Sequence, residues 1–145
     1  MSHHLVVRVV SKLLIPFILL FGLYVQFHGD FGPGGGFQAG VIFASAFILY
    51  ALVFGLDNAR KVAPDIVVRF GMAAGVLLYG FTGVVSMLCG GNYLDYSVLS
   101  SSAVGGQHLG ILIVELGVGI TVGAVMIAIF FNFAGRDHKI DKLEE

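Results

Sequence analysis

Four long apolar stretches divide the chain, and shorter segments rich in glycine or in charged residues separate them. We expect helices over about 9–27, 37–56, 66–89 and 107–133. Each is close to the ~20 residues that a helix needs to cross the hydrocarbon core of a bilayer, and the fourth is long enough to tilt. The pattern therefore predicts an all-α integral membrane fold of four transmembrane helices in one domain, followed by a mixed-charge tail over 135–145.

The composition supports a membrane protein. The chain is 57% hydrophobic and only 12% charged, with a mean hydropathy of +0.94, whereas a globular domain carries about 25% charged residues. The formal charge of −1 and the lack of a basic cluster give no indication of nucleic-acid binding. The single cysteine, Cys89, excludes an internal disulfide and a cysteine-based metal cage. No cofactor is expected.

The cations predict the orientation in the membrane. In a four-helix topology all eight lysines and arginines fall on one side, and the segments over 28–36 and 90–106 contain none. By the positive-inside rule both termini are cytoplasmic and these two loops face outward. The cations are Arg8, Lys12, Arg60, Lys61, Arg69, Arg136, Lys139 and Lys142.

A glycine-rich segment over 27–40 connects the first two stretches. Pro33 fixes its own φ and keeps Gly32 extended, so the entry to the segment is stiff. The run from Gly34 to Gly36 has no Cβ atoms, so it can adopt positive φ or touch a neighbour closely. We expect a turn at or near the bilayer surface, with a structural role favoured over direct ligand contact.

Three of the four stretches carry small residues four apart, the spacing that lets membrane helices approach closely. Three such stripes are more than one four-helix monomer needs, so we expect part of them to face partner subunits. They are Gly36, Gly40 and Ala44 in the second stretch, Gly71 and Gly75 in the third, and Gly119 and Gly123 in the fourth.

Glu115 is the only acid well inside a predicted span. A carboxylate at that position costs about 2–3 kcal/mol on insertion scales, so it should face protein or water and have a partner. His108 lies seven residues earlier, on nearly the same helix face and about 10 Å nearer the outside. The two side chains could be successive stations for a proton. Alternatively, Glu115 is protonated and hydrogen-bonds a neighbouring helix or subunit, with His108 merely at the membrane interface.

The outward loops add polar groups and no cation. His28 and Asp30 lie in the first loop, and Asp95 lies in the second. Acidic walls concentrate cations, so these groups could form a vestibule that leads toward Glu115. An ordinary solvated surface explains the same residues, and one carboxylate with a few loop oxygens does not define a sodium site.

The glycine segment resembles a motif of the MrpB/MnhB family, a small subunit of the Mrp-type (Mnh, Pha) multisubunit sodium/proton antiporters. That motif reads Gly-His-x-x-Pro-Gly-Gly-Gly-Phe followed by a helix that starts with small residues, and here it is matched by Gly29 and by Pro33-Gly34-Gly35-Gly36-Phe37 running into Gly40. Asp30 stands where the family usually has histidine, and a histidine precedes the glycine instead, at His28. The resemblance extends to chain length, helix count and the segment from Leu109 to Val118, so it covers nearly the whole chain.

The resemblance implies a multi-pass subunit of the bacterial inner membrane, in a hetero-oligomer of six or seven different subunits related to the membrane arm of respiratory complex I. The large antiporter-like subunits of that family carry the principal proton pathways. The MnhB-type subunit would pack beside other small subunits and help to line or shape a route for Na⁺ and H⁺. The chain is then a non-catalytic subunit of a secondary transporter.

Two alternatives remain open. A membrane-bound hydrogenase or another redox complex related to complex I uses an equivalent small subunit, and its co-purifying partners would carry nickel or iron–sulfur clusters. The chain could also be an assembly subunit whose polar residues carry no ions.

Overall fold

A computed structural model describes the backbone over residues 2–29 and 32–144 and the side chains over 5–29 and 32–136. Four helices are long and apolar enough to cross a membrane, at Leu5–His28, Gly36–Phe54, Asp65–Leu88 and Ala103–Arg136. The prediction of an all-helical chain with four candidate spans is therefore confirmed. The complete elements are α1 (Ser2–His28), α2 (Gly36–Phe54), α3 (Leu56–Val62), α4 (Asp65–Leu88), the 3₁₀ helix η1 (Tyr96–Leu99) and α5 (Ala103–Glu144).

The helix ends differ from the predicted bounds in two informative places. The second stretch ends at Phe54, and Gly55 adopts a φ of 93° that lets the chain break and restart as the short helix α3. The fourth helix begins at Ala103, four residues earlier than predicted, and continues through the tail to Glu144. The predicted tail is thus a helical extension of α5.

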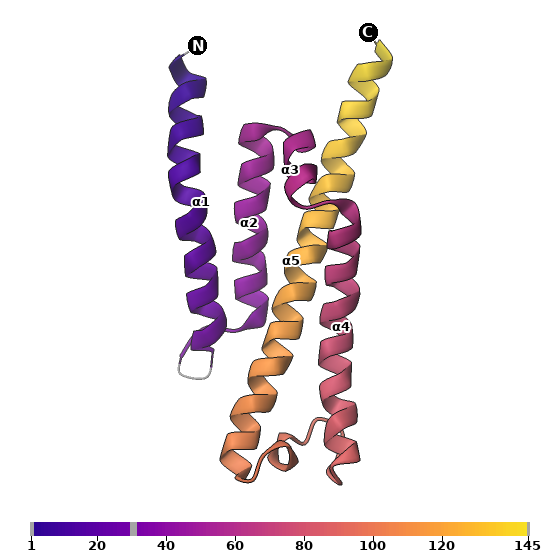
Figure 1. Cartoon of the computed structure of the whole chain (residues 1–145). Coiled ribbons are helices and arrows are strands. Elements are labelled where there is room, and N and C mark those ends of the chain that lie inside the picture. The colour runs from indigo at the N-terminus through magenta and orange to yellow at the C-terminus, as the bar shows by residue number, and fades with distance from the viewer. Residues whose placement is uncertain (1, 30–31, 145) are drawn as a thin grey trace.

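The four long helices form an open row in the order α1, α2, α5, α4 (Figure 1). Each packs on the next, α3 joins α2 to α4, and α1 touches α5 only slightly. Within the described residues no more than marginal contact joins α1 to α4, so the row does not close into a four-helix bundle. The two chain termini lie at the same end of the helices, the upper end in Figure 1.

Glycines allow the close contacts at the centre of the row. A methyl group built on Gly40 would come within 2.6 Å of the Gly119 carbonyl oxygen, and one on Gly75 would come within 2.6 Å of the Gly117 carbonyl oxygen. These contacts are between helix backbones, as expected for membrane helices that associate through small residues. The expectation that part of the stripes faces partners is wrong for these glycines, because α2, α4 and α5 use them against one another.

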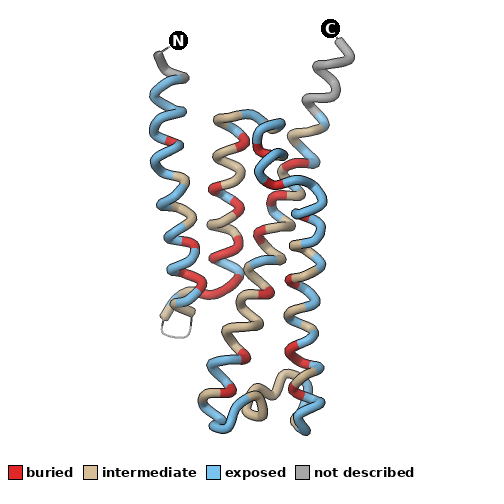
Figure 2. Tube along the Cα trace, viewed as in Figure 1, coloured by how far each residue is buried: buried red, intermediate tan, exposed pale blue. Residues whose placement is uncertain are grey.

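Burial follows the same row. Buried positions are most frequent on α2 and about equally frequent on α4 and α5, whereas on α1 they gather near the glycine turn and most of that helix is exposed (Figure 2). A small apolar core also forms where α3 meets α2, α4 and α5, around Ala59 and Phe131. The exposed residues of the four spans are predominantly large and apolar, as a bilayer or partner helices require.

Candidate functional site

The turn between α1 and α2, here called the glycine turn, comprises residues 29–36, of which Asp30 and Phe31 lie outside the described residues. It folds back onto the last turn of α1, since the Gly35 amide donates to the Val25 carbonyl oxygen at 3.2 Å. Gly35 has a φ of 128°, a conformation that favours glycine. Gly34 is equally constrained, because a methyl group there would lie 2.8 Å from the Val25 carbonyl oxygen. The predicted structural role of the glycines has a clear physical basis.

The glycine turn wraps around the side chain of Glu115. A methyl group built on Gly29 would come within 2.7 Å of Glu115 Oε2 and 2.8 Å of Oε1, and one on Gly35 would come within 3.1 Å of Oε1. A methyl group on Gly36 would collide with the backbone carbonyl of Glu115 itself. The carboxylate therefore sits in a cradle of backbone without side chains, at the start of α2. Helix N-termini stabilise negative charge, so this end of α2 suits a carboxylate.

The glycine turn lies partway along α5. Glu115 is twelve residues from the start of α5 at Ala103, which places the turn about 18 Å from that end of the helix. The loop between α4 and α5 thus extends well beyond the glycine turn, as Figure 1 shows. The two loops that were predicted to share one membrane surface are therefore offset by about 18 Å along the axis of α5.

Gln26 is a polar residue of this region that the sequence pattern did not single out. It lies on α1 with only 6% of its surface exposed, and its Oε1 is close to Gly119, one helical turn from Glu115. Its Nε2 is buried and has no hydrogen-bond partner among the described residues. An amide within an otherwise apolar stretch was the available signal. Sequence alone did not show that Gln26 faces α5.

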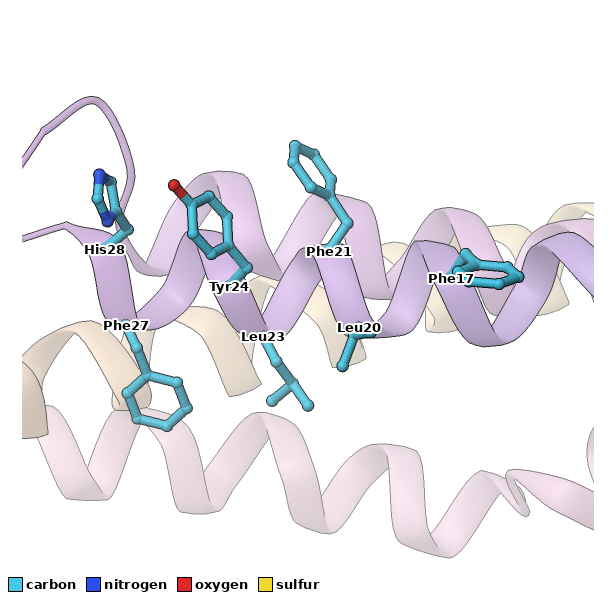
Figure 3. Close-up of a pocket in the computed structure, with 7 residues that line it drawn as sticks. All are labelled: Phe17, Leu20, Phe21, Leu23, Tyr24, Phe27 and His28. Carbon is cyan, nitrogen blue, oxygen red and sulfur yellow. The ribbon is translucent and has the colours of Figure 1, made fainter.

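His28 belongs to an aromatic row on the exposed side of α1. Its ring stacks on Tyr24 with centroids 5.0 Å apart, and Tyr24 in turn lies 6.3 Å from Phe21. Figure 3 shows these rings on one side of α1 while Leu23 and Phe27 point to the other side. The imidazole also borders the glycine turn, since a methyl group on Gly32 would lie 3.2 Å from His28 Nε2. Asp30, the other candidate of this loop, lies outside the described residues.

His108 is near the start of α5, exposed, and seven residues from Glu115 on the same continuous helix. That spacing corresponds to about 10 Å along the helix axis. Pro33 and Phe37 are exposed on the glycine turn and the first turn of α2, and Gly40 is buried against α5.

The loop between α4 and α5 is ordered by its own contacts. Asp95 caps η1, because its carboxylate accepts a hydrogen bond from the Ser97 amide at 3.2 Å. The Tyr96 ring packs on Gly110 of α5, and burial, with smaller contributions from Tyr79 and Tyr93, raises the pKa of Tyr96. This arrangement accounts for Asp95 as a structural cap.

Four apolar helices of spanning length, and a carboxylate inside one of them against the glycine turn, define a multi-pass membrane protein. A protein-family profile described as "Domain related to MnhB subunit of Na+/H+ antiporter" matches residues 6–128. The chain therefore belongs to the MnhB family, as its glycine motif predicted.

Known relatives agree with this assignment. The chain is similar to a protein named "Putative antiporter subunit mnhB2" from Staphylococcus aureus strain Newman, with 36% identity over 137 residues that cover 92% of this chain and 96% of the relative. Proteins of the same name from strains JH1 and Mu3 / ATCC 700698 match equally. The family is a component of a transporter and not an enzyme.

Proposed function

We propose that the chain is the MnhB-type subunit of a multisubunit Na⁺/H⁺ antiporter and that Glu115, held by the glycine turn, is an ion-exchange station on a cation or proton route. The observation that carries the proposal is the position of the Glu115 carboxylate between Gly29 and Gly35. An ionisable group inside a membrane span is costly and is usually retained for function.

In this proposal the glycine turn lies near the middle of the bilayer, and not at its outer surface as the sequence predicted. Gly75 of α4 is level with Gly117 and Thr121, and the charged start of α4 at Asp65 is ten residues away, about 15 Å toward the end that carries the termini. With Asp65 at the cytoplasmic boundary, this distance is half of a hydrocarbon core about 30 Å thick. The far end of α4 supports the placement, since Phe81, Met87 and Leu88 there are apolar and exposed.

Non-helical backbone at such a depth is tolerated where protein buries it or where it lines a water-filled cavity. The glycine turn meets this condition through α5 on one side and the end of α1 on the other. Both termini then face the cytoplasm, in accordance with the cations at that end, and the η1 loop faces outward. The other antiporter subunits cover the exposed apolar faces.

The test is Na⁺/H⁺ exchange in vesicles that contain the whole complex. Glu115→Gln removes the charge and keeps the shape, and we expect it to reduce exchange at least tenfold while the complex still assembles. Asp57→Asn, which removes a carboxylate from α3 at the cytoplasmic end, is the matched control and should retain exchange. Gly29→Ala should give an intermediate loss, because its methyl group displaces the carboxylate and leaves its charge.

Normal exchange by Glu115→Gln in a fully assembled complex would refute the role of Glu115 and favour a structural subunit. Purification of the native complex tests the broader assignment. Antiporter-like partner subunits are expected, whereas partners with nickel or iron–sulfur clusters would assign the chain to a redox complex.

A further inference from the structure

Because the row of helices is open, an elongated apolar cavity lies between its first helix, α1, and its last, α4. The cavity has a volume of about 350 Å³, and α1 and α4 form its walls over a floor of α2 and α5. Its lining includes Leu23 and Phe27 from α1, Phe47 from α2, Val67 from α4 and Ile120 from α5. Gln26 lines it at the level of the glycine turn, but its Nε2 is fully covered, so it gives the cavity no free donor.

The dimensions of the cavity select its occupant. Its lining on α5 runs from Leu116 to Ile127, eleven residues or about 16 Å along the helix. A volume of about 350 Å³ over this length describes a narrow space, whose size suits a single hydrocarbon chain better than a whole helix about 10 Å in diameter. The length is also close to half of a hydrocarbon core of about 30 Å, the reach of a lipid tail from one leaflet.

A smaller apolar space lies next to the cavity, on the side nearer the helix ends that carry the chain termini. A second apolar space of about 140 Å³ shares Phe47 with the first and passes between Ile15 of α1 and Val62 of α3. Phe47 stands between the two spaces, and together they extend from the level of the glycine turn to the junction of Ile15 on α1 with Val62 on α3. This junction is the mouth through which a tail would enter from the membrane leaflet on that side.

The mouth is positively charged. Lys12 lies one turn before Ile15, exposed, with its Nζ 5.8 Å from the ring centroid of Phe54, and Lys61 is exposed beside Val62. Among the side chains that the structure describes, the acidic groups at this end are Asp57 on α3 and Asp65, whose Oδ1 lies 3.9 Å from Arg60 Nε. Lysines at a membrane surface attract the anionic headgroups of lipids.

We propose that this cavity is a binding site for one anionic phospholipid, with one acyl chain between α1 and α4 and the headgroup phosphate at Lys12 and Lys61. The lipid fills the space between α1 and α4 and covers the side of α1 that carries Leu23 and Phe27. Its tail ends beside the glycine turn, where it keeps the apolar side of the Glu115 region dry. The site does not depend on whether Glu115 carries ions.

Photolabelling of the assembled complex tests the site. The complex is reconstituted in vesicles with phosphatidylglycerol that carries a diazirine on one acyl chain, and after illumination the labelled residues are mapped by mass spectrometry. We expect label on cavity-lining residues such as Phe47 and Ile120. A matched phosphatidylcholine probe should label these residues several-fold less.

Two pairs of variants separate a built site from general contact with lipid. Val67→Trp places bulk in the cavity and should abolish its labelling, whereas Ile66→Trp, on a neighbouring residue that does not line the cavity and is 76% exposed, should retain it. Lys12→Gln with Lys61→Gln should remove the preference for phosphatidylglycerol. Arg69→Gln with Arg136→Gln removes the same charge at the same end and should keep the preference.

Label only on outward residues such as Phe17 and Phe21, with none in the cavity, would overturn the proposal and mean that protein fills the space. Equal labelling by both probes, or an unchanged preference in the lysine variant, would overturn the assignment of the headgroup.

Discussion

The α1–α2 hairpin closes through the glycine turn, whose Gly29, Gly35 and Gly36 lie against Glu115, twelve residues into α5. The α4–α5 hairpin closes through residues 89–102, at the tips of those two helices. Glycines are essential to both closures, but they accommodate different partners. In the first hairpin Gly29 and Gly36 accommodate the carboxylate and the backbone of Glu115. In the second, Gly83 and Gly110 accommodate the rings of Tyr93 and Tyr96.

The contact at Gly36 is rigid, because its neighbours are backbone atoms, whereas the contacts at Gly83 and Gly110 can adjust, because their neighbours are side-chain rings. Helix backbone cannot move aside for an added methyl group, while an aromatic ring near the surface can rotate away. Gly36→Ala should therefore cost more than alanine at Gly83 or Gly110. Gly106 of the second closure is a separate case, because it meets the backbone carbonyl oxygen of Tyr96. The first hairpin holds Glu115, and the second mainly covers the ends of α4 and α5 that lie opposite the chain termini.

The largest effect is expected for Gly36→Ala. Its methyl group would meet the Glu115 carbonyl carbon at 2.8 Å and the Gly119 amide nitrogen at 3.0 Å, and both are backbone atoms. Overpacking of this kind costs about 1–3 kcal/mol or more. We expect the complex to lose this subunit on mild heating, measured by size-exclusion chromatography in detergent. Gly32→Ala, whose methyl group meets only the His28 side chain at 3.2 Å, is the control and should retain the subunit.

A second prediction compares two glycines of α4. Gly75→Ala should destabilise the α4–α5 contact by about 1–3 kcal/mol, because its methyl group would meet the Gly117 carbonyl oxygen at 2.6 Å. Gly80→Ala, five residues along the same helix, meets nothing within 4 Å and should stabilise the helix by about 0.5–1 kcal/mol. Thermal unfolding of the complex with each variant measures the difference. Equal effects would show that the two positions have the same surroundings.

The smallest effect concerns Tyr96 and alkaline pH. Burial raises the pKa of Tyr96 in the folded protein above the usual value of about 10. The folded state therefore binds the phenolic proton more tightly than the unfolded state does, so this stability is complete below about pH 10 and is lost as pH rises through the folded pKa. We expect thermal stability to fall more steeply above about pH 10 in the wild type than in Tyr96→Phe. Tyr24→Phe should behave like the wild type, and identical curves for all three would contradict the prediction.

Hydropathy predicted the four spans because each apolar stretch has the length of a membrane-crossing helix. It did not predict α3, since its seven residues include Asp57, Asn58, Arg60 and Lys61 and follow Gly55 without an apolar period. Nor did it predict the offset between the hairpins. Segment lengths do not say at which level two helices meet, and here the contacts of Gly36 with Glu115 and of Gly75 with Gly117 set those levels.

The candidate site was predicted in part. Glu115 could be singled out because it is an acid within an apolar span, and the glycine segment because of its composition. Their contact could not be foreseen, since Gly29 and Glu115 are far apart in the sequence and only tertiary packing joins them. Gln26 was missed for the same reason, and the role of His108 as a second station stays a prediction.

The length of α5 has a mechanical consequence. Its 42 residues form one uninterrupted helix about 63 Å long, twice the thickness of the hydrocarbon core. A tilt of only about 5° around the glycine contacts would move the end at Glu144, some 43 Å from Glu115, by nearly 4 Å. A small tilt at the level of the carboxylate is thereby magnified at the far end of this helix.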